Sequence, residues 1–250
     1  MSQKIYNHVD GLLLIDKPQD WTSHDVVNCV RRRFNLDKTG HCGTLDPFAT
    51  GLLVLLLGKA TKLQDQLMGQ NKIYAGTIRF GIETDSEDRT GKTLSQSDTS
   101  TLSVESLTAA AAQFLGPQTQ IPPMVSALKV AGQPLYKLAR QGKTVERAPR
   151  PIQIFSFVLN EIRLPVAEAD FVVCCSKGTY IRTLAADLGR RLGCGAHLQE
   201  LRRISSGNLN VEQAYGIDVV KTWELPNLTA KILPMPKRQP LENDAMSKPE

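Results

Sequence analysis

One stretch of this 250-residue chain constrains the fold more than any other, because it joins a glycine-rich polar loop directly to an apolar run. Residues 38–51 read Lys-Thr-Gly-His-Cys-Gly-Thr-Leu-Asp-Pro-Phe-Ala-Thr-Gly, and residues 52–57 are apolar throughout. A run without polar residues is typical of an element that is buried on both faces, so we expect the loop to lie against the protein interior. Loops held in this way are where binding and catalytic side chains commonly lie.

Asp46 is the only carboxylate in this loop, so any role as acid, base or nucleophile in the stretch falls to it. It is followed by Pro47, and an Asp-Pro step is also a good helix start. The carboxylate would then cap free N–H groups, and the proline would occupy the first helical position. The two roles are compatible, and the spacing by itself leaves both open.

The composition is that of an ordinary globular protein. Hydrophobic residues make up 41% of the chain and charged residues 22%, which suffices for a substantial core, and the net charge of +5 is compatible with a polyanionic partner. The five cysteines show no C-x-x-C spacing, so we expect reduced thiols in a cytoplasmic protein, without a disulfide framework or zinc site. The first apolar run is too short for a signal sequence, and no stretch approaches the length of a membrane span.

Apolar periodicity predicts strands and helices that alternate irregularly. We expect strands at residues 11–17, 72–82, 120–132, 151–159 and 170–176, and helices that begin near Thr22, Lys59, Ser103 and Gly178. The last two strands form a hairpin-like pair, which argues against a doubly wound parallel sheet. The residues therefore predict a mixed fold of the α+β class.

Charge is distributed unevenly along the second half of the chain. Residues 129–150 contain six Lys or Arg against one acid, with Tyr136 interleaved. Surfaces that bind single-stranded nucleic acid combine basic and aromatic residues in this way, although a solvated face would look similar. Arg182 lies near a helix start, where a cation opposes the helix dipole, and this indicates a negative partner elsewhere. From residue 226 onward the chain is rich in proline, so we expect a disordered tail over 226–250.

Several motifs resemble those of the TruB family of tRNA pseudouridine synthases, in the same order and over roughly residues 10 to 210. The matches are G-H-x-G-T-L-D-P-x-A-x-G-x-L at 40–53, K-x-Y at 72–74, Y-x-R at 180–182 and L-x-R-x-x-x-G at 201–207, with an early K-P…T-S segment at 17–23. The resemblance implies the pseudouridine synthase fold, in which a bent, mostly antiparallel mixed sheet is flanked by helices and carries the active cleft across its middle.

The resemblance also implies a domain organisation. One catalytic domain would cover residues 1–225, with a mobile thumb-like insertion at about 117–150 that closes over the RNA. Bacterial members commonly append a small RNA-binding PUA domain. Only about forty residues follow Leu209, which we expect to be too few for such a domain.

Family membership would give the site residues specific roles. Asp46 would be the nucleophile, Arg182 its orienting cation, and Tyr74 the residue that stacks on the target base and transfers a proton. An arginine beside Asp46 would hold the pKa of that carboxyl below its usual value of about 3.9. In this family's terms, His41 would insert into the RNA loop and Leu201 would line the uracil pocket. The full set of implied substrate contacts is His41, Gly43, Thr44, Lys72, Lys129, Arg140, Tyr180 and Leu201.

The implied reaction is isomerisation of the uridine at position fifty-five in the T-loop of tRNA. The resemblance implies no cofactor and no metal, and we expect a stand-alone cytoplasmic monomer that binds the T-arm and loop of tRNA. Three alternatives stay open. They are a non-catalytic tRNA-binding or folding module, a guide-RNA-dependent pseudouridine synthase, and a hydrolytic N-glycosidase that uses Asp46.

Overall fold

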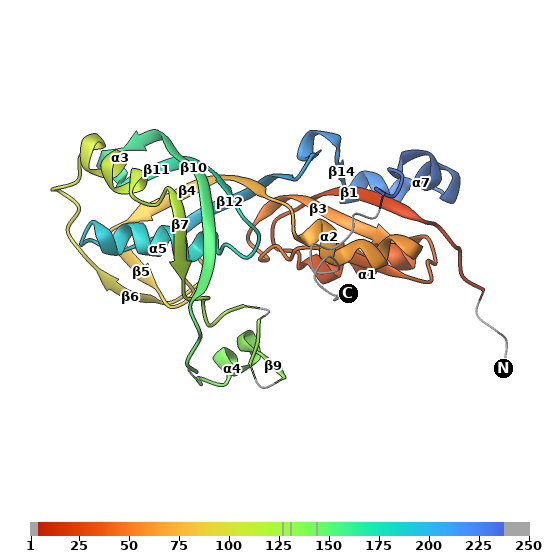
Figure 1. The fold of residues 1–250 in the computed structure, drawn as a ribbon, viewed down its shortest axis with the longest axis horizontal. Helices are drawn as coiled ribbons and strands as arrows, with labels where there is room; N and C mark the ends of the chain where they lie inside the picture. The colour runs from red at the N-terminus through yellow and green to blue at the C-terminus, as the bar shows by residue number, and fades with distance from the viewer. Residues whose placement is uncertain (1–4, 127, 131, 144, 238–250) are drawn as a thin grey trace, which may run out of the picture.

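The computed structural model describes residues 5–126, 128–130, 132–143 and 145–237. Within this part of the chain, ten strands form one sheet, whose main path runs β14-β1-β3-β12-β4-β11-β10-β7 (Figure 1). Its strands are β1 (Gly11–Lys17), β2 (Thr39–Cys42), β3 (Thr50–Leu57), β4 (Lys72–Phe80), β7 (Gly116–Gln120), β10 (Arg150–Arg163), β11 (Glu168–Cys175), β12 (Ala196–Ser206), β13 (Leu209–Asn210) and β14 (Tyr215–Gly216). Two small ribbons pair β5 (Ile82–Thr84) with β6 (Thr93–Gln96) and β8 (Lys129–Val130) with β9 (Gln133–Pro134).

The sheet is mixed and mostly antiparallel, as predicted. Its parallel pairs are β1 with β14 and β3 with β12, and the other strand pairs are antiparallel. The predicted hairpin is confirmed, because β10 and β11 pair in antiparallel register. β12 lies in the middle of the sheet between β3 and β4, so a strand from late in the chain joins two early ones.

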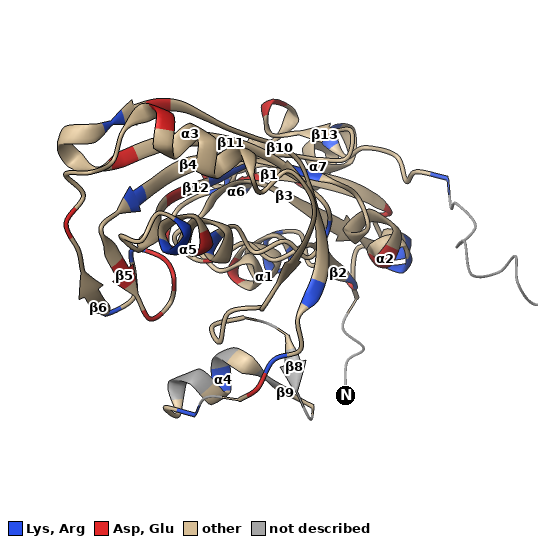
Figure 2. Ribbon diagram, turned by 60° about the vertical axis from the view of Figure 1, so that its left-hand side comes forward, with Lys and Arg blue, Asp and Glu red and all other residues tan. Residues whose placement is uncertain are grey.

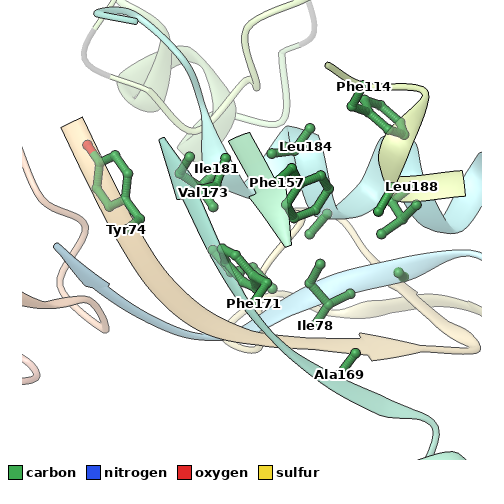
Figure 3. Packing of buried hydrophobic residues seen from close by; sticks show 14 of the residues in the cluster. Tyr74, Ile78, Phe114, Phe157, Ala169, Phe171, Val173, Ile181, Leu184 and Leu188 are labelled. Atoms are coloured by element: carbon green, nitrogen blue, oxygen red, sulfur yellow. The ribbon is translucent and has the colours of Figure 1, made fainter. Parts of the chain in front are cut away.

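Helices cover the sheet and bury its apolar residues. They are α1 (Ser23–Arg33), α2 (Gln64–Met68), α3 (Val104–Ala112), α4 (Leu135–Arg140), α5 (Ile181–Arg191), α6 (Ile217–Thr222) and α7 (Leu225–Lys231), with short 3-10 turns η1 (Gly58–Leu63), η2 (Leu164–Val166) and η3 (Val211–Gln213). One core lies between α3, α5 and strands β4, β10, β11 and β12 (Figure 3). A second lies between α1, α6 and strands β1 and β3. The apolar run 52–57 is fully buried in β3, as its composition predicts.

The helix expected near Thr22 is confirmed. The Thr22 side chain accepts a hydrogen bond from the Asp25 N–H, and the Asp25 carboxylate accepts one from the Thr22 N–H. This reciprocal arrangement is a capping box, which fixes the start of α1. Ser103 caps α3 in the same way, so the helix expected there is also confirmed.

Some predicted elements differ from the structure. The strand expected over 72–82 ends at Phe80, because Gly81 has a φ of +82° and turns the chain into β5. The helix expected from Lys59 is a 3-10 turn followed by the short α2. No strand spans 120–132 in the described residues; β7 ends at Gln120, and Pro122 and Pro123 follow, which have no N–H to donate to a sheet.

The tail predicted from residue 226 is partly wrong. Residues 225–231 form α7, in which Leu228 is fully buried, and Leu233 bridges to Leu12 of β1. Pro226 lies in the first turn of α7, where the missing N–H is harmless, so proline here begins a helix instead of marking disorder. Residues 238–250 lie outside the described part of the chain.

The segment predicted as a thumb projects away from the sheet. α4, β8 and β9 form a small lobe beyond the ends of β7 and β10 in both views (Figures 1 and 2). None of the described helices is long and apolar enough to cross a membrane.

Candidate active site

The loop that carries Asp46 connects β2 to β3 and is fixed from two sides. On one side the Ser23 hydroxyl, at the start of α1, accepts from the Leu45 N–H at 2.9 Å and donates to the Leu45 carbonyl at 3.2 Å. On the other side the fully buried Lys17 ammonium donates to the Pro47 carbonyl at 3.1 Å. Burial lowers the pKa of Lys17 to about 8. These contacts hold the backbone on both sides of Asp46.

Asp46 does not begin a helix. Its carbonyl accepts from the Ala49 N–H at 3.1 Å in a single turn, and β3 begins at Thr50. The Pro47 carbonyl, which a helix would use, accepts from Lys17 and from the Asp20 N–H at 2.8 Å. The helix-cap alternative is therefore wrong, and the carboxylate is left for other contacts.

Arg182 supplies those contacts from the first turn of α5. Its Nε lies 2.9 Å from Oδ2 of Asp46, and its Nη2 donates to Oδ1 at 3.2 Å. The remaining donors reach the Ser86 carbonyl at 3.0 Å, the Val125 carbonyl at 2.7 Å and the Asp88 carboxylate at 3.5 Å. Every nitrogen of the guanidinium thus has an oxygen partner. The position of Arg182 at a helix start predicts a negative partner, and the carboxylates of Asp46 and Asp88 fill this role.

The carboxylate and guanidinium differ in their exposure. The Asp46 side chain is 33% exposed, whereas the Arg182 side chain is 4% exposed. The guanidinium therefore lies beneath the carboxylate and leaves part of it open to a ligand. A carboxylate that is held by two points on a rigid fork is oriented as well as charge-compensated.

The predicted direction of the Asp46 pKa is wrong. Burial raises the pKa of Asp46 above its ordinary value, and Asp88 adds to this, while Arg182 is the largest opposing influence. The sequence identified the cation but could not reveal the desolvation of the carboxylate, which disfavours its charged form. The contact with Arg182 is accordingly what favours the ionised form of Asp46 against its surroundings.

Asp88 is a site residue that the sequence did not single out. Its side chain is 5% exposed, and its Oδ1 accepts from the Ser86 hydroxyl, the Thr90 N–H and the Thr90 hydroxyl at 2.6–2.9 Å. This leaves Oδ2 for Arg182. In the sequence Asp88 is one of several acids in a polar turn, so only the three-dimensional contact distinguishes it.

Tyr74 lies on β4, opposite Val173 of β11 and Arg203 of β12. It is 8% exposed and packs at the edge of the α5 core, where Figure 3 shows its hydroxyl pointing away from the phenylalanine rings. Burial raises the pKa of Tyr74, and the nearby Arg203 guanidinium opposes this effect. The tyrosine is therefore neutral at physiological pH, with a hydroxyl that can donate or accept a hydrogen bond.

Arg203 was also missed, although it is the arginine of the L-x-R motif. It is 1% exposed, and it donates from Nε to the Leu52 carbonyl at 2.6 Å and from Nη2 to the Gly43 carbonyl at 3.1 Å. These contacts tie both ends of the Asp46 loop to the sheet. Gly51 has a φ of +98°, and a Cβ there would lie 2.3 Å from the Arg203 carbonyl oxygen, so close approach of the two strands requires glycine.

The predicted substrate residues lie on the elements around the pair, and their roles stay predictions. His41 on β2 is half-buried, with a buried Nδ1 that has no hydrogen-bond partner among the described residues. Tyr180 is half-buried and Leu201 is buried. Gly43 is half-buried with a φ of +80°, and Thr44 is exposed. The side chains of Lys129 and Arg140, and of the interleaved Tyr136, lie outside the described part of the structure.

Lys72 has intramolecular partners in this structure. It is 6% exposed, and its ammonium donates to the Met68 carbonyl at 2.8 Å and to the Gln70 carbonyl. Burial lowers the pKa of Lys72 to about 8. The ammonium therefore fixes the chain that leads from α2 into β4, and the substrate contact predicted for it is untested.

A cavity of about 360 Å³ lies beside the loop. Phe48 and Leu201 contribute to its wall, together with Gln19, Thr50 and Arg89. The described residues contain no group of three or more His, Cys, Asp or Glu arranged to hold a metal ion.

Two family models match adjoining parts of the chain. The model described as "TruB family pseudouridylate synthase (N terminal domain)" matches residues 31–181, and "tRNA pseudouridylate synthase B C-terminal domain" matches residues 182–236. The boundary between them falls at the start of α5. β12, which follows this boundary, pairs with β3 and β4, which precede it, so both matched parts contribute strands to one sheet.

Similar proteins carry names of the same kind. A relative from Opitutus terrae called "tRNA pseudouridine synthase B" is 47% identical over 93% of this chain and 95% of its own length. A relative of the same name from Geobacter sulfurreducens is 46% identical over 91% of this chain and 74% of its own length. Among solved structures, a chain of a "Cbf5-Nop10-Gar1 Complex" matches with a TM-score of 0.69 and 29% identity over 90% of this chain. This chain spans 60% of that chain's length. The motif order, the fold and these matches together establish that the chain belongs to the TruB family of pseudouridylate synthases.

Proposed function

We propose that this protein is a tRNA pseudouridine synthase that isomerises the T-loop uridine at position fifty-five. The reaction breaks the C1′–N1 glycosidic bond, rotates the detached uracil and rejoins it to C1′ through C5. The observation that carries the proposal is the two-point contact between Asp46 and Arg182, with a carboxylate that is 33% exposed, inside the motif that resembles the family's catalytic loop. Relatives named tRNA pseudouridine synthase B, at 46–47% identity, support the substrate class.

In this proposal Asp46 is the nucleophile. Detaching uracil calls for attack on the sugar C1′ or on uracil C6, and an ionised carboxylate can do either. Arg182 keeps Asp46 ionised against the desolvation that raises its pKa, and holds both oxygens in a fixed direction. Because Arg182 is itself held by Ser86 and Val125, the carboxylate is oriented before substrate arrives.

Tyr74 acts on the base in this proposal. A uridine in a folded tRNA loop must be flipped out, which costs a few kcal/mol of stacking and pairing. Contact with an aromatic face returns about 1–3 kcal/mol per base. Its hydroxyl, held neutral by burial, would relay the proton that leaves C5 when the rejoined base regains its aromatic form: the oxygen takes this proton as its own O–H proton passes to water.

The remaining contacts would hold the RNA around the flipped nucleotide. Leu201 would line the uracil pocket, and His41 would insert into the RNA loop, with Gly43, Thr44 and Tyr180 beside them. Lys129 and Arg140 would contact phosphates from the thumb-like segment at 117–150. Burial lowers the pKa of His41 in the protein, so its ring is neutral before it contacts the RNA, on whose bases it would stack.

We further propose that the chain works as a stand-alone cytoplasmic monomer on the T-arm of tRNA, without a cofactor. The structural match to a chain from a Cbf5-Nop10-Gar1 complex raises the alternative of a synthase that needs partner proteins. The higher identity to relatives named tRNA pseudouridine synthase B favours direct action on tRNA.

The test is one incubation of the purified chain with a tRNA transcript that carries tritium at uracil C5. Release of tritium to water without free uracil means isomerisation and supports the proposal. Release of free uracil means hydrolysis by an N-glycosidase, and binding without either product means a tRNA-binding module. Each of the latter two outcomes overturns the proposal.

A further inference from the structure

We propose that Gln120 is a positioning residue for the catalytic pair, because its side-chain amide fixes the start of α5 and thereby the guanidinium of Arg182. Gln120 is the last residue of β7, far from Arg182 in sequence. This inference rests on the proposed function, since it gives Gln120 a part in that reaction without contact to the substrate.

The amide of Gln120 makes a two-point contact with the backbone of Tyr180. Its Oε1 accepts from the Tyr180 N–H at 2.8 Å, and its Nε2 donates to the Tyr180 carbonyl at 2.9 Å. Gln120 is 4% exposed, so little water competes for its amide group. Because the planar amide contacts both the backbone N–H and the backbone carbonyl of Tyr180, it fixes the position and the rotation of that residue, as pairing with a neighbouring strand would.

Tyr180 is the residue at which α5 begins, and its own side chain makes no capping hydrogen bond. Its carbonyl accepts the first helical bond, from the Leu184 N–H at 3.1 Å. Arg182 lies within this first turn. The first N–H groups of a helix have no partner within the helix, and Gln120 satisfies one of them, that of Tyr180, from the end of β7. The direction in which Arg182 leaves the helix therefore depends on Gln120.

The same glutamine stands where the thumb-like segment leaves the sheet. Directly after Gln120 the chain enters residues 121–126, where the Val125 carbonyl accepts from Nη2 of Arg182 at 2.7 Å. On the returning side Arg147 donates to the Pro122 carbonyl at 3.2 Å. Figure 1 shows β7 and β10 side by side, with β7 leading toward α4 and β9 and β10 returning from them. Gln120 thus joins the base of the thumb-like segment to the helix that carries Arg182.

A glutamine at a buried position could serve only to stabilise the fold, and the two roles make different predictions. A stabilising role would lower the unfolding temperature and leave the rate of each folded molecule unchanged. A positioning role would lower the rate of the chemical step at saturating RNA and leave RNA affinity unchanged. It would also move the acid limb of the rate profile to higher pH, because a displaced Arg182 offsets less of the desolvation of Asp46.

The experiment compares Gln120→Met with Gln118→Met as a matched control. Gln118 lies on the same strand, and its amide makes long contacts of 3.4 and 3.5 Å to the Gln113 and Leu115 carbonyls. A second variant, Gln120→Glu, keeps the acceptor for the Tyr180 N–H and loses the donor, so it tests the idea even if Gln120→Met does not fold. Each protein is assayed for single-turnover tritium release from the C5-labelled transcript, for transcript affinity, and for the pH dependence of the rate.

We expect Gln120→Met to lower the single-turnover rate about 10- to 100-fold, as misplacement of a catalytic group by a fraction of an ångström to 1 Å does. Gln120→Glu should lose less, and Gln118→Met should match wild type. Wild-type rate and acid limb in folded Gln120→Met, or in Gln120→Glu if the former does not fold, would overturn the inference. A wild-type protein that releases no tritium would instead overturn the proposed function.

Discussion

Replacing Arg182 with lysine separates the charge of this residue from its shape. In the structure the guanidinium contacts five oxygen atoms, which belong to Asp46 (two), Asp88, Ser86 and Val125. A lysine ammonium keeps one positive charge but has only three donors on a single nitrogen. At least two of the five contacts are therefore lost, and the two-point contact with Asp46 cannot form in its present geometry.

The size of the effect follows from these contacts. Each buried oxygen left unpaired costs roughly 1–3 kcal/mol, so Arg182→Lys should lower the free energy of unfolding by about 2–6 kcal/mol. A carboxylate displaced by about 1 Å from its attacking position loses about 100-fold in rate. Arg182 is also the largest influence that lowers the pKa of Asp46, so weakening the contact should raise that pKa further. The acid limb of the rate profile should then move to higher pH.

The assay is single-turnover tritium release as a function of pH, on protein shown to be folded by its thermal transition. Transcript affinity is measured in parallel and should stay near wild type, because the buried Arg182 does not reach the surface. A variant with wild-type rate and an unmoved acid limb would mean that the fork geometry is irrelevant, and the account of the pair would have to be abandoned.

Three further predictions concern neighbouring groups. Asp88→Asn should lower the single-turnover rate about 10-fold with little change in RNA affinity, because Arg182 loses its second acidic partner; an unchanged rate would contradict this. Tyr74→Phe should keep RNA binding and lose proton transfer, so normal turnover would refute that role. Asp46→Asn should be at least as stable as wild type at neutral pH, because the raised pKa means that the ionised acid opposes folding. This advantage should shrink as the pH falls through the raised pKa, and a stability difference that does not depend on pH would contradict the assignment.

Local patterns predicted much of the fold. The capping box at Thr22, the run 52–57 and the β10–β11 hairpin each depend on residues that are close in sequence, so the pattern itself specifies the element. The contact between Asp46 and Arg182 was expected from matched motifs and from a cation at an unfavourable helix position. The structure brings those two side chains together.

The supporting residues could not be found in this way. Asp88 and Gln120 are ordinary polar residues in the sequence, and Arg203 stands in a matched motif that gave it no role; for all three, the contacts with distant parts of the chain emerge only in the folded arrangement. Their signal is burial: each is a polar side chain that is at most 5% exposed. Sequence patterns do not report burial for polar residues, and the direction of the Asp46 pKa was mispredicted for the same reason.

Proline was the other source of error. The proline content of residues 226–250 predicts disorder. In the structure, Pro226 lies in the first turn of α7, and Leu228 of that helix is buried. Conversely, the strand predicted over residues 120–132 includes Pro122 and Pro123, whereas in the structure both follow Gln120, the last residue of β7. In both places the effect of proline depends on where it lies relative to the end of a helix or strand.

The central claim is that an ionised, partly exposed Asp46, held in place by Arg182, attacks the flipped uridine. Single-turnover tritium release by Asp46→Asn tests it most directly, on a C5-labelled transcript whose binding to the variant is measured in the same experiment. The account predicts transcript affinity close to wild type and no release of tritium at any pH. Release at a rate near wild type would contradict it, because the amide cannot serve as the nucleophile.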